Sequence, residues 1–286
     1  MTYSIVARDP SSGELGVAVQ SHWFSVGSVV TWAEAGVGVV ATQAFADPSY
    51  GPLGLSLMRG GKSSADALKA LTSVDEQAGR RQVAMIDGLG RVATYTGDQC
   101  LGEASHVAGE TYSCQANMML RDTVPSAMAS AYESASGDLV DRLLAALDAA
   151  EAEGGDIRGR QSAALLVVGD RPLELRVEDH AEPLLELRRL VAVKRSYDLM
   201  NEIDAHLATE DFEAAAKCYE AAQIGTPDNV EFTFWRGVML ANFGKLDEAR
   251  GFLSRTYAAP TGEWKELLRR LPSVGLLSQD VADQLV

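Results

Sequence analysis

A strand-like pattern begins at the second residue of this chain. Within residues 2–9 (TYSIVARD), Tyr3, Ile5 and Ala7 recur at every second position, which is the period of a strand packed on at least one face. Chain ends usually fray unless something holds them. We therefore expect this end to be held in a sheet, and the rest of the fold to be organised around that first strand.

Pairs of strands alternate with helices along the next 170 residues. A turn at residues 10–13 separates the first run from a second at 15–21, which predicts a hairpin. Further strand-like runs lie at 26–32, 37–43, 82–87, 91–96, 111–116, 162–168 and 173–177, and helical patterns lie at 54–58, 63–71, 124–132 and 139–152. A parallel doubly wound sheet would alternate single strands with helices. The observed order favours two antiparallel sheets with helices outside them.

Beyond about residue 185 the pattern is helical and repeats. Phe212, Ala215 and Tyr219 recur 34 positions later as Leu246, Ala249 and Leu253. Thirty-four residues is the tetratricopeptide period. We therefore expect two domains, residues 1–182 and 183–286, the second a small helical domain of about two repeats. Its role is either packing and dimerisation or binding of a peptide or partner protein in a concave groove.

Composition argues against several classes of partner. The formal net charge of -15 opposes binding to nucleic acid, whose phosphates are neutralised by Lys and Arg, and to anionic membranes. We expect neither a signal peptide nor a membrane span. Three distant cysteines and four scattered histidines fit neither a disulfide framework nor a zinc site. We expect a cytoplasmic protein with no metal and no organic cofactor.

Thr2 is the nucleophile that the sequence favours. If Met1 is removed, Thr2 carries a free α-amine beside its own hydroxyl. An α-amine with a pKa of about 7.7 to 8.0 can take the hydroxyl proton through a bridging water. Many chains begin with Met-Thr, so an unreactive terminal residue is the alternative. No other Ser, Thr or Cys comes with a comparable base or with a nucleophile signature.

Six short motifs carry a family resemblance. They are TYSIVARD at 2–9, GVAV at 16–19, ATQA at 41–44, PSYGP at 48–52, QANM at 115–118 and GDIRGRQSAA at 155–164. Over about residues 1–180 they resemble the large bacterial family catalogued as domain of unknown function 1028. That family is assigned to the N-terminal-nucleophile (Ntn) hydrolase superfamily. The resemblance implies an α+β fold, a four-layer αββα sandwich, in which Thr2 attacks a small amide or peptide-like bond and its amine shuttles the proton.

Position-by-position matching then implies further site residues. Asn117, at the end of a strand, suits a neutral and rigidly held oxyanion-hole amide, although it could equally cap a turn. Asp156, Arg158 and Arg160 lie on a glycine-rich loop. A paired Asp and Arg there would anchor a substrate carboxylate or brace the loop.

Four more polar residues are expected at the substrate. His22 ends the second strand, which the hairpin places beside the first, and its alternative is an ordinary strand-end histidine. Thr42, Gln43 and Ser162 lie on strand ends. They either line the site or are buried sheet residues whose polar atoms the backbone satisfies.

The resemblance leaves the activity open, because the family has no settled function. Some relatives carry a C-terminal segment proposed to bind peptidoglycan, which implies a cell-wall peptide amide as an alternative substrate. A second alternative is a binding or scaffold protein that keeps the sandwich without the chemistry and holds a partner on its helical repeats. We expect a homo-oligomer in each case.

Overall fold

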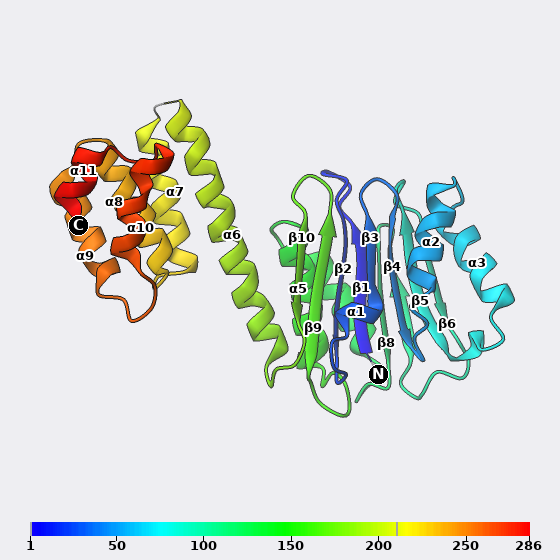
Figure 1. Cartoon of the computed structure of the whole chain (residues 1–286). Coiled ribbons are helices and arrows are strands. Elements are labelled where there is room, and N and C mark those ends of the chain that lie inside the picture. Colours follow the sequence, from blue (N-terminus) through cyan, green and yellow to red (C-terminus); the bar gives the residue numbers. More distant parts are fainter. Residues whose placement is uncertain (1, 210) are drawn as a thin grey trace. The chain divides into compact units, whose positions relative to one another are not determined.

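The computed structural model describes residues 2–209 and 211–286 (Figure 1). It divides into two compact units, the first ending at Leu190 and the second beginning at Val191. This division falls within helix α6 (Pro183–Ala208). Met1, whose removal the Thr2 mechanism requires, lies outside the described residues, as does the side chain of Phe212 in the repeat pattern.

Two antiparallel sheets make up the strand-containing part of the first unit. The larger has the strand order β10-β9-β2-β1-β8-β7 and the smaller has the order β3-β4-β5-β6. The larger contains β1 (Thr2–Arg8), β2 (Leu15–Ser21), β7 (Ser105–Ala108), β8 (Tyr112–Asn117), β9 (Ser162–Val168) and β10 (Leu173–Val177). The smaller contains β3 (Thr31–Glu34), β4 (Gly38–Ala44), β5 (Arg81–Asp87) and β6 (Val92–Thr96). The prediction of paired strands in two antiparallel sheets is confirmed.

Helices cover the outer face of each sheet, and the two inner faces pack on each other. Helices α4 and α5 contact the larger sheet, whereas α2 and α3 contact the smaller one. Their bounds are α2 (Tyr50–Arg59), α3 (Ser64–Val74), α4 (Val124–Ser134) and α5 (Leu139–Ala152). The core between the sheets joins Val6 and Val17 of one to Val39 and Ile86 of the other. The central strands are thus buried on both faces, which explains their nearly continuous apolar runs.

Strand β1 directs alternate side chains to the two neighbouring layers. The Tyr3 hydroxyl donates to Glu151 of α5 at 2.7 Å, so Tyr3 faces the helices. Ser4 donates to Gln43 of the smaller sheet at 2.7 Å, so Ser4 faces the other way. Thr2 shares the face of Ser4, because side chains of a strand alternate with a period of two. The first strand is therefore held centrally in the larger sheet, and Thr2 faces the space between the sheets.

One stretch departs from its predicted conformation. The β-branched residues 26–32 predict a strand, but the structure has helix α1 (Gly27–Val30) followed by β3. Val26 and Val30 both reach the core between the sheets. One helical turn brings these two side chains together, whereas a strand would hold them about 13 Å apart. Strand β7 is not predicted from sequence, because its four residues, SHVA, contain only one β-branched residue.

The second unit is helical, and its buried positions follow the predicted repeat. Its core contains Ala215 and Tyr219 and, one repeat later, Ala249 and Leu253. Trp235 packs against the same core. The remaining elements are α7 (Phe212–Gly225), α8 (Val230–Asn242), α9 (Leu246–Tyr257), α10 (Trp264–Arg270), the 3₁₀ turn η2 (Leu271–Val274) and α11 (Gln279–Leu285). None of the described helices has both the length and the apolar character needed to cross a membrane.

Replacing Leu143 on α5 tests how tightly this helix packs on the larger sheet. Leu143 is fully buried, and its Cδ1 lies only 2.7 Å from the position that a Cβ on Gly16 would occupy. We expect Leu143→Ala to lower the free energy of unfolding by about 2 to 5 kcal/mol, because the cavity cannot close completely. Leu185→Ala, at a 68% exposed position, is the matched control and should cost less than about 0.5 kcal/mol. Urea unfolding curves measure both, and equal midpoints for the two variants would contradict the packing described.

Candidate active site

Thr2 stands at the start of β1 with its hydroxyl beside a second hydroxyl. The strand register places Thr2 opposite Asn117 of β8, and pairing with β2 brings Ser21 to its other side. The Thr2 hydroxyl donates to Ser21 Oγ at 3.2 Å, and Thr2 is 5% exposed. A hydroxyl can both donate and accept a hydrogen bond. Ser21 therefore orients the Thr2 hydroxyl and offers it a partner for proton exchange.

A cavity of about 320 Å³ opens beside this pair of hydroxyls. Four of its lining residues are polar or charged, and the others are apolar. The lining residues are Thr2, Ser21, Trp23, Val26, Val29, Val30, Gln43, Ala44, Phe45, Ala46 and Arg158. Of the residues expected from sequence, Thr2, Gln43 and Arg158 therefore meet at one cavity.

Two side-chain amides hold the backbone carbonyl of Thr2. Gln43 Nε2 and Asn117 Nδ2 each donate to this oxygen at 3.3 Å. Both also donate to Oε1 of Gln82 on β5, at 2.8 and 2.9 Å respectively. The two hydrogens of the Asn117 amide are thus engaged behind the cavity. In this arrangement Asn117 positions Thr2 and does not direct a donor at a bound substrate.

Asp156 braces the loop that carries Arg158. Its carboxylate accepts hydrogen bonds from the backbone N–H groups of His22 at 3.0 Å and Arg158 at 2.9 Å. The Arg158 guanidinium pairs with the same carboxylate at 3.0 Å. These contacts fix the loop from which Arg158 extends to the Thr2 cavity. His22 is attached to this loop through its backbone, and its Nδ1 has no hydrogen-bond partner among the described residues.

Arg160 lies apart from this group. Its guanidinium pairs with Glu151 at 3.0 Å and with Glu182. Glu151 also accepts the hydrogen bond of Tyr3, on the helix-facing side of the larger sheet. Arg160 is not among the described residues that line the Thr2 cavity. The structure thus separates it from Arg158, although the two are close in sequence.

The hydroxyls of Thr42 and Ser162 bond to backbone groups. Thr42 donates to the carbonyl of Asp47 at 3.2 Å. Ser162 donates to the carbonyl of Trp23 and accepts from the N–H of Val26 at 3.0 Å. Trp23 and Val26 line the Thr2 cavity, so Ser162 shapes the cavity by holding its wall.

Three residues around the cavities adopt the left-handed backbone conformation that normally favours glycine. Ser25 has φ 56°, Ala44 has φ 69° and Met118 has φ 56°. Such conformations cost of order 1 to 3 kcal/mol each and persist only where surrounding contacts enforce them. They cluster at functional sites. Ala44 ends β4 and lines both cavities, Met118 follows β8 and lines the second one, and Ser25 precedes Val26 in the wall of the Thr2 cavity.

A buried ion pair anchors the turn after Ala44. Arg81 Nη1 donates to the carbonyl of Phe45 at 2.6 Å, and Arg81 Nε pairs with Asp75 at 2.7 Å. The Tyr50 hydroxyl donates to the same carboxylate at 3.0 Å. The hydrogen bond from Arg81 holds the pKa of Asp75 at about 2, below its ordinary value of 3.8. The wall shared by both cavities therefore depends on a carboxylate that is ionised at neutral pH.

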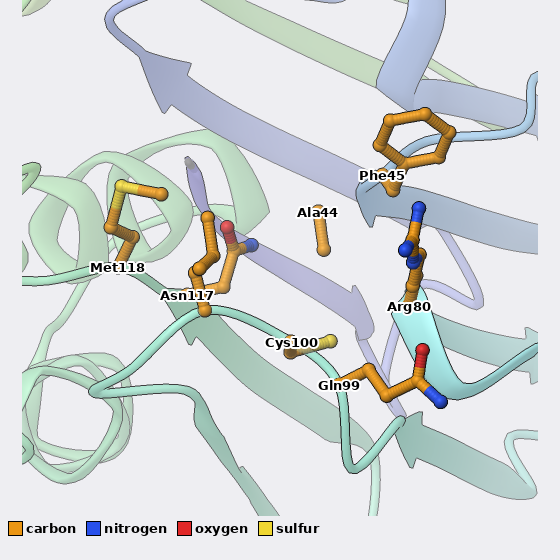
Figure 2. Close-up of a pocket in the computed structure, with 8 residues that line it drawn as sticks. Ala44, Phe45, Arg80, Gln99, Cys100, Asn117 and Met118 are labelled. Carbon is orange, nitrogen blue, oxygen red and sulfur yellow. The ribbon is translucent and has the colours of Figure 1, made fainter.

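A second cavity of about 300 Å³ shares Ala44 and Phe45 with the first (Figure 2). It is lined by Ala44, Phe45, Arg80, Gln99, Cys100, Leu101, Asn117 and Met118. Sequence reasoning identifies only Asn117 among them. Arg80 and Phe45 carry no local pattern that distinguishes them from other surface residues, and Ser21 of the first cavity likewise lacks a nucleophile signature.

Burial disfavours the thiolate form of two cysteines. Burial raises the pKa of the Cys100 thiol and that of the Cys114 thiol, and the reactive form of a cysteine is the thiolate. No group of three or more His, Cys, Asp or Glu side chains in the described chain is arranged to hold a metal ion.

Comparison with known proteins is consistent with the motifs. Residues 2–187 match a family described as "Family of unknown function (DUF1028)", and residues 200–263 match the tetratricopeptide repeat. A comparison with curated proteins gives no match.

Two solved structures are similar to the chain. A crystal structure of a protein from Silicibacter pomeroyi, described as DUF1028, has 32% sequence identity and a TM-score of 0.63, and the match covers 66% of this chain and 87% of that one. Anbu (ancestral beta-subunit) from Yersinia bercovieri has 12% identity and a TM-score of 0.32, with 65% of this chain and 91% of that one covered.

The pH dependence of stability tests the Asp75–Arg81 anchor. Because the pKa of Asp75 is lowered to about 2 in the folded protein, its ionisation stabilises the fold fully above pH 3.8, and this contribution is lost as the pH falls through 2. We expect Asp75→Asn to remove about 1 to 2 kcal/mol of pH-dependent stability, less than the whole shift implies because solvent screens part of the pair. Urea unfolding at pH 7 and near pH 2 measures it. The difference in free energy of unfolding between wild type and Asp75→Asn should be smaller near pH 2 than at pH 7. Asp170→Asn, at an exposed carboxylate, should show no such change.

Proposed function

The chain belongs to the DUF1028 family, and we propose that it is an amidohydrolase in which Thr2 is an N-terminal nucleophile. The observation that carries this proposal is the position of the Thr2 hydroxyl, which lines a cavity and donates to Ser21 Oγ at 3.2 Å. A nucleophile must be both oriented and reachable. The polar residues Ser21, Gln43 and Arg158 line this cavity together with Thr2, which supports access of a polar substrate to the hydroxyl.

The reaction needs no group beyond the chain itself and water. After Met1 is removed, the neutral α-amine of Thr2 takes the proton of the Thr2 hydroxyl, directly or through a water, while Oγ attacks the amide carbon. The tetrahedral intermediate collapses when the protonated amine gives its proton to the leaving nitrogen. Water, deprotonated by the same amine, then hydrolyses the Thr2 ester and releases the acid. One amide bond and one water are consumed in each cycle.

The surrounding residues divide into those that contact substrate and those that position Thr2. Gln43 and Asn117 fix the Thr2 carbonyl from two strands, so their removal should misplace the amine. Arg158 lines the cavity on a loop held by Asp156, and we assign its guanidinium to the substrate carbonyl or to the oxyanion that forms from it. His22, Thr42 and Ser162 act through the segments that they hold.

The layer order supports an Ntn-type fold. Helices, the larger sheet, the smaller sheet and helices follow one another, which is the arrangement of an αββα sandwich. The proposed nucleophile begins the central strand β1 and faces the space between the sheets. That position is what the Ntn assignment requires of Thr2, and the experiment below tests the chemistry independently of the fold.

A competing function is a binding protein that uses the helical unit, and the tetratricopeptide match at residues 200–263 favours it. Stacked helical repeats present extended surfaces that bind peptides or proteins. This function does not depend on Thr2. It predicts that Met1 removal and the Thr2 hydroxyl are both dispensable.

Covalent labelling of Thr2 separates the two functions. We expect intact-mass measurement to show loss of Met1, and a β-lactone probe to add one label per chain. Thr2→Ala should abolish labelling, because it removes the hydroxyl that shares a residue with the α-amine. Thr2→Ser should retain it, because the hydroxyl remains. Thr123→Ala, at an exposed threonine, is the matched control and should label like wild type. Labelling of protein that retains Met1, or equal labelling of Thr2→Ala with an unchanged unfolding curve, would exclude Thr2 as the nucleophile.

A further inference from the structure

The second cavity adjoins the proposed reaction centre and lies outside the roles assigned above. It shares Ala44 and Phe45 with the Thr2 cavity. Asn117, which lines it, donates to the Thr2 carbonyl at 3.3 Å. In Figure 2, Asn117 and Met118 lie on one side of Ala44, and Arg80 with Gln99 lies on the other. The two cavities are therefore adjacent, with Ala44 and Phe45 between them.

Arg80 is the cation of this cavity, and no carboxylate of residues 2–209 and 211–286 pairs with it in the structure. Its side chain is exposed, and its guanidinium lies 5.7 Å from the ring centre of Phe45. Neighbouring arginines differ, since Arg81 pairs with Asp75 and Arg158 pairs with Asp156. Among the described residues, Arg80 has no ion pair and no side-chain hydrogen bond. In a chain with a formal charge of -15, a cation left unpaired in a cavity wall suits an anionic ligand.

The other walls of the cavity suit an apolar group. Phe45 is 59% exposed and Leu101 is 64% exposed, and both line this cavity together with Met118. Large apolar side chains exposed in a concave surface commonly contact a ligand. The ring of Phe45 also supports the guanidinium of Arg80, which keeps the planar donor group at the cavity. One cation therefore stands beside an apolar surface.

We propose that this cavity, which we call the Arg80 subsite, binds a carboxylate and an adjacent apolar group of the amide substrate. This inference rests on the proposed function, because it names the substrate class of the same site. A guanidinium binds a carboxylate through two parallel N–H donors. The single charge of Arg80 matches a monoanion better than a doubly charged phosphate. The substrate class is then a small amide with a free carboxylate near the scissile bond, such as an acylated apolar amino acid.

Binding to the full-length Thr2→Ala variant tests the subsite without any turnover. The probes are N-acetylleucine, N-acetylphenylalanine and phenylacetylglycine, each paired with its neutral carboxamide, titrated by calorimetry or by ligand-observed NMR. We expect at least one carboxylate to bind about tenfold more tightly than its carboxamide. A second substitution, Arg80→Gln, made in the Thr2→Ala variant should remove this preference. Arg171→Gln, made in the same variant, removes the same charge at a 72% exposed side chain and should preserve the preference.

The outcomes separate this inference from the proposed function. A preference that survives Arg80→Gln, or a panel in which no carboxylate binds better than its carboxamide, overturns the subsite even if Thr2 is labelled. A preference that Arg80→Gln abolishes supports the subsite even if Thr2 proves unreactive. Unfolding curves of the double variants should match that of Thr2→Ala, because Arg80 makes no ion pair among the described residues. The preference should also weaken as salt is added, since it arises from charge at an exposed site.

Discussion

One amide oxygen, Oε1 of Gln82, ties the two sheets together behind Thr2. It accepts from Gln43 on the neighbouring strand at 2.8 Å and from Asn117 on the opposite sheet at 2.9 Å. Each of those amides also donates to the Thr2 carbonyl. The placement of the proposed nucleophile therefore depends on a contact between sheets and on more than its own strand. A substitution of Gln82 would therefore alter the position of Thr2 through Gln43 and Asn117.

This polar end contrasts with the apolar cluster that contains Val6, Val17, Val39 and Ile86 between the sheets. Gln82 Nε2 donates to the Ala116 carbonyl at 2.9 Å and to Thr96 Oγ1 at 3.0 Å, so its amide is satisfied on both atoms. A buried polar group costs free energy unless it is hydrogen-bonded, and these amides are. Pairing of this kind also fixes geometry more sharply than apolar packing, because hydrogen bonds are directional. The polar cluster thus supplies the rigidity that a nucleophile requires, at the same end where the cavities open.

Access to Thr2 is set by backbone that the sheets alone do not determine. The turn after β4 begins with Ala44 in a left-handed conformation, and Arg81 holds the following carbonyl at Phe45. Together they place Phe45 between two cavities. One of these cavities contains Arg158, whose charge Asp156 offsets. The other contains Arg80 and an apolar wall, which gives the site two chemically different halves.

The sequence by itself determined the paired strands, the helical repeat and the position of Thr2 at the start of a strand. Side-chain periodicity carries that information locally, and the same period makes Thr2 face the side of Ser4. The motif resemblance also identified Gln43 and Arg158, which line the cavity. It identified Arg160 as well, but the ion pairs of Arg160 with Glu151 and Glu182 hold that side chain away from the cavity.

Only the tertiary structure decided what surrounds Thr2. Phe45 and Arg80 reach the site through the pairing of β4 with β5, whose segments are far apart in the chain, and nothing in their local sequence distinguishes them. Ser21 lies on the predicted hairpin, but only the structure shows its hydroxyl beside that of Thr2. The helix at 27–30 shows the same limit, because burial of Val26 and Val30 in the core overrides their β preference. Local propensity is a property of neighbouring residues, whereas a cavity is formed by packing between layers, and so the fold was readable from the sequence and the shape of the site was not.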